Sequence, residues 1–245
     1  MIKFFRHIRQ RLIGENRFSK YLLYAIGEII LVVIGILIAL QINNWNENRK
    51  ERILENSILD KISTNIQDDI NQYNKILSAE NSARVKVDSF LTIIRNPMRF
   101  QTSDLDPYYK SLWYFQRFTP NKSALTNLIS SGKINIIENQ ELLENVLGYY
   151  KTIDEQTASV DEALASYSRN EIGPYIMKFD FMDSNAINSE YRKRKSLLEY
   201  HQEPAIENLA YARIQLMNTQ RAYYLRQINN AKTLLEMINL ELKKQ

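Results

Sequence analysis

Residues 19–52 read SKYLLYAIGEIILVVIGILIALQINNWNENRKER, and this stretch decides what kind of protein the sequence describes. From Leu22 to Ile42 the only charged residue is Glu28. About 20 mostly apolar residues, rising about 1.5 Å each, cross the roughly 30 Å hydrocarbon core of a bilayer. The alternatives are a buried helix of a soluble domain, which seldom stays apolar on every face, and a cleaved signal peptide, whose apolar region is shorter. The stretch therefore predicts a transmembrane helix over residues 21–43.

The charges on either side of this helix predict its orientation. Six basic residues precede it against one acidic residue, Glu15, whereas the charges that follow it cancel. Because Lys and Arg are retained on the cytoplasmic side, we expect residues 1–20 to form a basic, amphipathic cytoplasmic tail. Residues 21–43 are then a signal-anchor helix, and residues 44–245 form one extracytoplasmic helical domain. The basic residues expected to bind anionic lipid of the inner leaflet are Lys3, Arg6, Arg9, Arg11, Arg17 and Lys20.

Aromatic residues stand at both ends of the apolar stretch. Such rings favour the headgroup level of a bilayer, where one side of the ring is apolar and the other is wet. The expected membrane-interface anchors are Phe18, Tyr21 and Tyr24 on the inner side and Trp45 on the outer side.

Glu28 raises the question of why an acid lies inside an apolar helix. Its carboxyl group could reach the inner headgroups or be protonated, and neither explanation needs a partner. On a helical wheel, however, Gly35 and Ala39 fall within about 20° of Glu28. Small residues four apart let a second helix approach closely, and an intramembrane acid is expected to face a partner. We therefore predict a helix–helix contact through Glu28, Val32, Gly35 and Ala39, with a second copy or with another membrane protein.

The rest of the chain is poor in helix breakers. Only eight Pro and Gly residues follow Asn43, and none lies between Ile36 and Asn96. Apolar residues recur at steps of three and four from Leu54 to Ile94, and near-heptad steps run from Leu216 to Leu242. The fold class expected is all-α: one N-terminal transmembrane helix, then an elongated extracytoplasmic helical bundle with long coiled-coil-like helices.

Turn and capping residues divide the domain further. Pro97 and Pro107 bracket a loop, and a short aromatic helix is expected over residues 108–118. Thr119 and Pro120 have the features of an N-cap and first-turn pair, which predicts a helix ending at Gly132. Asn139 is expected to cap the next helix, which runs to about residue 170, and the last helix is expected to begin near Pro204.

Enzyme chemistry finds little support in the sequence. The absence of cysteine excludes thiolate catalysis and thiolate metal sites. His201, with Glu199 and Glu203 nearby, offers potential metal ligands, but a surface histidine is the favoured interpretation. Asp68 and Asp69 are expected on an exposed helix face, because adjacent helical residues diverge by about 100° and do not form a catalytic pair. We expect no enzyme activity, no cofactor and no metal.

The charge balance argues against nucleic acid as a partner. The first 42 residues hold six basic and two acidic residues, which leaves 26 of each in the remainder. The large domain therefore has no net positive field. Its basic run, residues 192–195, is best explained as a solvated face.

Two segments resemble a known family. They are MIKFFRHIRQRL with FSKYLLYAIGEIILVVIGILIALQINNWNE, which together cover most of residues 1–47, and SSGKINIIENQELLENVLGYY at residues 130–150. Both are similar to DUF6090, a family of Gram-negative bacterial single-pass membrane proteins known only as a domain of unknown function. The resemblance implies an inner-membrane protein whose helical domain, residues 44–245, lies in the periplasm. It implies no activity and no ligand.

Two classes of function remain. The first is an anchored interaction or scaffold protein that binds membrane lipid and a second copy or another membrane protein. The alternative is a periplasmic ligand-sensing module that signals through a separate membrane partner, because about twenty cytoplasmic residues are too few for an effector domain. A helical periplasmic enzyme is a distant third.

Overall fold

The computed structural model describes residues 18–178 and 195–244, with only the backbone described for residues 18–21, 24, 157–158 and 177–178. The chain divides into two compact units, Met1–Ser57 and Ile58–Gln245. Every regular element in the described residues is a helix, so the all-α fold class is confirmed.

The first unit contains the N-terminal part of helix α2, which as a whole spans Phe18–Arg95. Within this unit the large apolar side chains from Ile29 to Ile42 are between 46% and 63% exposed. A helix that exposes apolar side chains on all faces needs an apolar medium around it. Among the described residues, α2 is the one helix long and apolar enough to cross a membrane.

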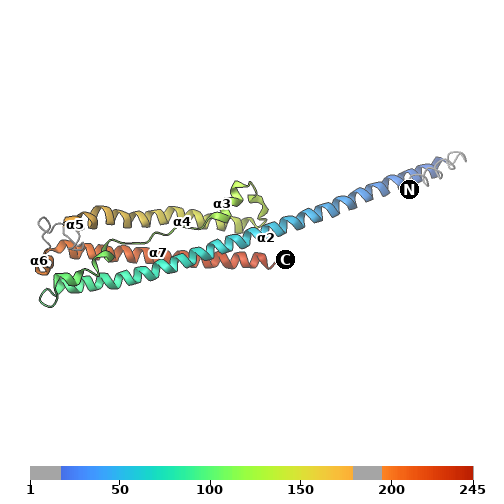
Figure 1. Cartoon of the computed structure of the whole chain (residues 1–245). Coiled ribbons are helices and arrows are strands. Elements are labelled where there is room, and N and C mark those ends of the chain that lie inside the picture. The colour runs from blue at the N-terminus through green and yellow to red at the C-terminus, as the bar shows by residue number, and fades with distance from the viewer. Residues whose placement is uncertain (1–17, 179–194, 245) are drawn as a thin grey trace. The chain divides into compact units, whose positions relative to one another are not determined.

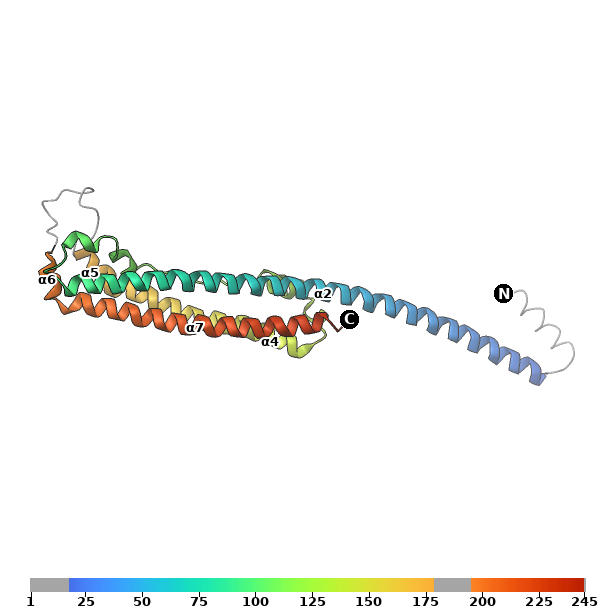
Figure 2. The same cartoon turned by 90° about the horizontal axis from the view of Figure 1, so that it is seen from below.

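Three long helices form the second unit: the part of α2 from residue 58 onward, α4 (Gln140–Ser166) and α7 (Pro204–Leu242). They lie side by side in both views (Figure 1 and Figure 2). From Ile62 onward the apolar steps expected on α2 are buried, as in Ile66, Tyr73 and Ile94, each 1% exposed or less. The first two steps differ, since Leu54 is 36% exposed and Ile58 is only partly buried. The periodicity of the sequence thus placed the core-facing side of α2 correctly.

Shorter elements join these helices. The connecting segment, residues 96–122, contains η1 (Thr102–Leu105) and η2 (Tyr109–Leu112). It leads into α3 (Ser123–Ser130) and η3 (Ile134–Ile136). After α4 come η4 (Tyr167–Ile172), α5 (Gly173–Lys178) and α6 (Leu197–His201).

Several predicted boundaries are confirmed. The Asn139 side chain accepts a hydrogen bond from the Leu142 backbone N–H at 3.1 Å and caps α4. Gly132 follows α3 with φ of 69°, a left-handed conformation that glycine adopts without steric cost. Pro204 is the first residue of α7.

The predicted aromatic helix over residues 108–118 is wrong, and so is the helix start at Thr119 and Pro120. Only η2 is helical there, and the chain then runs extended to α3 (Figure 1). Tertiary contacts replace the helical hydrogen bonds. The Phe118 ring stacks on Tyr73 with centroids 3.8 Å apart, and the Asn121 backbone N–H donates to Asp69 at 2.7 Å.

The apolar core of the second unit consists of two clusters. One includes α2 residues up to Leu77 and α7 residues from Tyr223 onward. The other includes α2 residues from Val87 and α7 residues up to Met217. Glu80 and Gln220 lie where one cluster gives way to the other, and Arg213 pairs with Glu80 from the neighbouring part of α7. These three buried polar side chains, here called the polar layer, are 7%, 0% and 0% exposed.

Candidate functional site

The four residues of the predicted membrane contact lie on α2 in the first unit. Glu28 is partly exposed, Val32 is 56% exposed and Ala39 is exposed. A Cβ atom added at Gly35 would meet no atom within 4 Å. The space beside this stripe is therefore open to a neighbouring helix or to lipid.

The other predicted membrane residues are only partly described. Trp45 is 65% exposed, and its place at the headgroup level stays a prediction. The backbones of Phe18, Lys20, Tyr21 and Tyr24 belong to α2, and their side chains lie outside the described residues. The basic residues that lie wholly outside the described residues are Lys3, Arg6, Arg9, Arg11 and Arg17.

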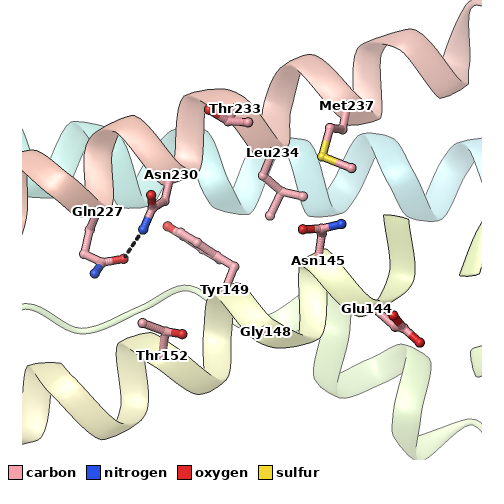
Figure 3. A pocket seen from close by; sticks show the side chains of 10 residues that line it. All are labelled: Glu144, Asn145, Gly148, Tyr149, Thr152, Gln227, Asn230, Thr233, Leu234 and Met237. Carbon is pink, nitrogen blue, oxygen red and sulfur yellow. Dashed lines mark hydrogen bonds between the residues drawn. The ribbon is translucent and has the colours of Figure 1, made fainter. Parts of the chain in front are cut away.

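A groove of about 330 Å³ runs between α4 and α7 (Figure 3). Asn145, Gly148 and Thr152 line it from α4, and Gln227 and Asn230 line it from α7. A Cβ atom at Gly148 would meet nothing within 4 Å, so packing within the chain does not require glycine there. Glu144, Leu234 and Met237 also line the groove, which therefore combines hydrogen-bonding groups with apolar surface.

The polar layer contains a buried ion pair. Arg213 Nη2 donates to both carboxylate oxygens of Glu80, at 3.1 Å and 3.3 Å. The same guanidinium donates to the backbone carbonyl groups of Tyr114 at 3.0 Å and Ser111 at 3.4 Å. Arg213 thereby ties α7 to α2 and to the connecting segment.

Two polar atoms of this layer have no hydrogen-bond partner among the protein atoms, Arg213 Nη1 and Gln220 Oε1. A buried polar atom without a partner costs about 1–3 kcal/mol, and a buried ion pair is seldom more stable than an apolar replacement. Stability alone therefore does not explain the polar layer.

A second cavity, of about 420 Å³, lies beside the polar layer between α2 and the connecting segment. Small side chains on α2, namely Ala79, Ser82 and Ala83, leave the space. Glu80 and Lys86 complete the wall on the α2 side. The connecting segment contributes Pro107, Lys110, Ser111, Tyr114, Phe115 and Gln116. A cavity of this size is within the usual range for small-molecule sites.

The expected exposure of the Asp68–Asp69 pair is wrong for Asp69, which is 1% exposed. Its carboxylate accepts from the Asn121 backbone N–H and, at 3.4 Å, from the Tyr149 hydroxyl group. Burial raises the pKa of Asp69 to about 6, against the lowering effect of these hydrogen bonds. Burial also raises the pKa of Asp161 to about 6, and Asp161 accepts from the Tyr224 hydroxyl group at 3.4 Å.

The acidic residues beside His201 have other roles in the structure. Glu199 caps α6 by accepting from the Ser196 backbone N–H, and Glu203 accepts from Tyr175 at 2.9 Å. His201 Nδ1 lies 3.0 Å from the Ile94 carbonyl oxygen. Over residues 18–178 and 195–244, no three His, Asp or Glu side chains are placed to hold a metal ion.

Sequence reasoning missed the polar layer and its cavity. A signal was present: the apolar steps of α2 stop at Leu77 and resume at Val87, with SAENSA between them at residues 78–83. No comparable signal marked Arg213, since α7 shows charged residues on its other faces as well.

The comparison with known families agrees with the sequence resemblance. The model of a family of unknown function, DUF6090, matches residues 28–157, more than half of the chain. The chain belongs to this family. The part that matches DUF6090 begins at Glu28 and includes Gly35, Ala39 and Glu80, whereas Arg213 lies beyond it. Nothing among curated proteins or solved structures matches the chain.

Proposed function

We propose that this DUF6090 protein is a single-pass membrane protein that acts as an interaction module. Helix α2 crosses the inner membrane with its N-terminus in the cytoplasm, and the helical bundle lies in the periplasm. In the membrane, α2 pairs with a second helix through the stripe of Glu28, Val32, Gly35 and Ala39.

The observation that carries this proposal is the open space at Gly35. Glycine weakens a helix by about 0.5–1 kcal/mol relative to alanine, so it is disfavoured where no close approach needs it. Within the chain nothing approaches Gly35, and Val32 on the same stripe is exposed. Small residues of this kind allow close helix packing in membranes, and the acid adds a polar contact.

In-cell photo-crosslinking tests the contact. A photo-crosslinking amino acid is placed at Ala39 in the full chain, and a matched one is placed at Leu37. Leu37 lies about 180° from Glu28 on the helix. We expect capture of a membrane protein at Ala39 and at least severalfold less at Leu37. A captured second copy identifies a self-associating anchor, and a different protein identifies a partner.

Glycine substitutions supply the second arm of this experiment. Gly35→Leu is expected to abolish the crosslink at Ala39. Gly27→Leu is the matched control, because a Cβ at Gly27 also meets nothing within 4 Å but points about 80° away from Gly35. Equal capture at Ala39 and Leu37, or capture that survives Gly35→Leu, would rule out the stripe as a contact.

The orientation has its own test. The chain has no cysteine, so Met98→Cys introduces a single thiol at a side chain that is 95% exposed. A membrane-impermeant maleimide added to cells with a permeabilised outer membrane is expected to label it. Labelling only after the inner membrane is broken would reverse the proposed topology.

A second candidate function is ligand sensing by the bundle through a separate membrane partner. The cavity beside the polar layer favours it, because Arg213 connects the wall of that cavity to both α2 and α7. A screen of small metabolites for an increase in the unfolding temperature of the full chain tests this role, since a ligand stabilises the state that it binds. If no metabolite raises the unfolding temperature, ligand sensing is ruled out in favour of the interaction module.

A further inference from the structure

We propose that the cavity between α2 and the connecting segment binds a small organic anion with a planar apolar body. This site is independent of the membrane contact, and it gives the ligand-sensing candidate a class of ligand. Loss of the crosslink at Ala39 and loss of anion binding are separate results, so each proposal can fail alone.

The cavity exists because the local sequence of α2 changes at this point. The face of α2 below the connecting segment carries Ala79, Ser82 and Ala83 where other turns carry Ile, Leu or Phe. The two apolar clusters end on either side of it. The connecting segment therefore passes over small side chains that cannot fill the space.

The charge that faces the cavity is positive. Glu80 is the acidic residue of the lining, and Arg213 neutralises it at 3.1 Å from behind the wall. Lys86 from α2 and Lys110 from η2 also line the cavity, and neither side-chain ammonium group forms a hydrogen bond or an ion pair with any residue that the structure describes. Two cations without carboxylate partners attract an anionic group.

The remaining lining suits a planar apolar body. Tyr114 is 55% exposed, and its ring lies 5.3 Å from Lys110 Nζ. Phe115 and Pro107 add further apolar surface. Aromatic and apolar side chains with a few polar groups are the usual composition of a small-molecule site.

Binding would link elements that the polar layer already joins. An anion held by Lys86 and Lys110 contacts α2 and the connecting segment at once. Arg213 does not contact the anion, because its side chain is fully buried. It instead donates to the backbone carbonyl groups of Ser111 and Tyr114, which belong to the cavity wall. The ligand therefore stabilises the connecting segment against α2 and α7.

Ligand-observed ¹⁹F NMR with the full chain in phosphatidylcholine nanodiscs tests the site. The probes are 4-fluorobenzoate, 4-fluorophenyl phosphate and the neutral, similarly shaped 4-fluorobenzamide, with empty nanodiscs as the blank. We expect both anions to broaden and the amide to bind about tenfold more weakly, as the loss of a charged hydrogen bond predicts. Tighter binding of the phosphate points to a phosphate ligand, and tighter binding of the benzoate points to a carboxylate ligand.

Matched variants locate the binding. The double variant Lys86→Gln/Lys110→Gln is expected to weaken anion binding at least about tenfold. The control Lys61→Gln/Lys75→Gln removes two exposed lysines of α2 away from the cavity and is expected to change nothing. Ser82→Leu fills the cavity with both lysines intact and is also expected to abolish binding. Equal binding of the amide and the anions, or anion binding unchanged in both the lysine and the Ser82 variants, would overturn the proposal.

Discussion

Two stretches of helix α2 have similar apolar residues and opposite surroundings. Between Ile29 and Ile42 every large apolar side chain is about half exposed, whereas Ile62, Ile66 and Ile94 in the second unit are 1% exposed or less. The first stretch is apolar on all faces, and the second is apolar at steps of three and four. The pattern, more than the content, of apolar residues therefore distinguishes a helix that is apolar on every face, and long enough to cross a membrane, from one that packs one face against other helices.

The largest loss of stability is expected at the polar layer, where polar side chains interrupt the buried apolar face of α2. Arg213→Ala leaves the Glu80 carboxylate buried without its partner and is expected to destabilise the bundle by about 3–5 kcal/mol. Chemical denaturation of the full chain in detergent micelles measures it. Arg226→Ala, which removes an exposed arginine of α7, is the matched control, with an expected cost below about 0.5 kcal/mol.

The same layer allows a sharper test of why it exists. Replacing both members together, Glu80→Leu with Arg213→Met, is expected to restore much of the stability lost in Arg213→Ala. A double variant that remains as unstable as the single one would show that the ion pair itself stabilises the fold.

A direct test of the comparison removes the same atoms from both stretches. Ile66→Ala is expected to cost about 2–5 kcal/mol, because it leaves a cavity in a packed core. Ile34→Ala, at a side chain 46% exposed, is expected to change the unfolding free energy by less than about 0.5 kcal/mol. Equal costs at the two positions would mean that the first stretch also packs against protein.

The buried carboxyl group of Asp69 is expected to make the stability of the bundle depend on pH. Its pKa is raised to about 6, so the folded state keeps a proton that the unfolded chain has already released. Stability from this group is therefore lost as the pH rises through about 6 and is regained below it. Lowering the pH from about 7.5 to about 5 is expected to raise the unfolding free energy of the unsubstituted chain by about 1 kcal/mol more than that of the Asp69→Asn variant. Asp68→Asn is the matched control, and a difference of the same size there would contradict the assignment.

Small effects of opposite sign are expected at two glycines of the bundle. Gly148→Ala is expected to stabilise α4 by about 0.5–1 kcal/mol, because nothing occupies the space that its Cβ would fill. Gly132→Ala is expected to destabilise by about 1–2 kcal/mol, because its φ of 69° strains a residue with a side chain. Thermal unfolding followed by circular dichroism compares them, and a destabilising Gly148→Ala would mean that the groove is closed in solution.

Helix positions were predictable where local signals acted alone. The Asn139 cap, the left-handed Gly132 and the start of α7 at Pro204 each depend on residues within one or two turns. The connecting segment was not predictable in this way. After η2 its residues are not helical, and they make contacts with distant parts of the chain. Phe118 stacks on Tyr73 and the Asn121 backbone N–H donates to Asp69, each about fifty residues earlier in the sequence.

The candidate sites divide along the same line. The proposed contact stripe of Glu28, Gly35 and Ala39 depends on helical spacing alone, because residues seven and eleven positions apart share one face of a helix. The anion cavity could not, because Lys86 and Lys110 come together only when the connecting segment folds back over α2. Arg213 reaches Glu80 from 133 residues away.

By itself, the sequence determined the helical fold, the apolar stretch at residues 21–43 and membership in DUF6090, because composition, periodicity and family motifs are local properties of the chain. Only the tertiary structure decided which polar residues are buried and which of them meet. Burial of Asp69, Glu80 and Arg213 depends on the elements that cover them, and no spacing along one helix records what packs against it.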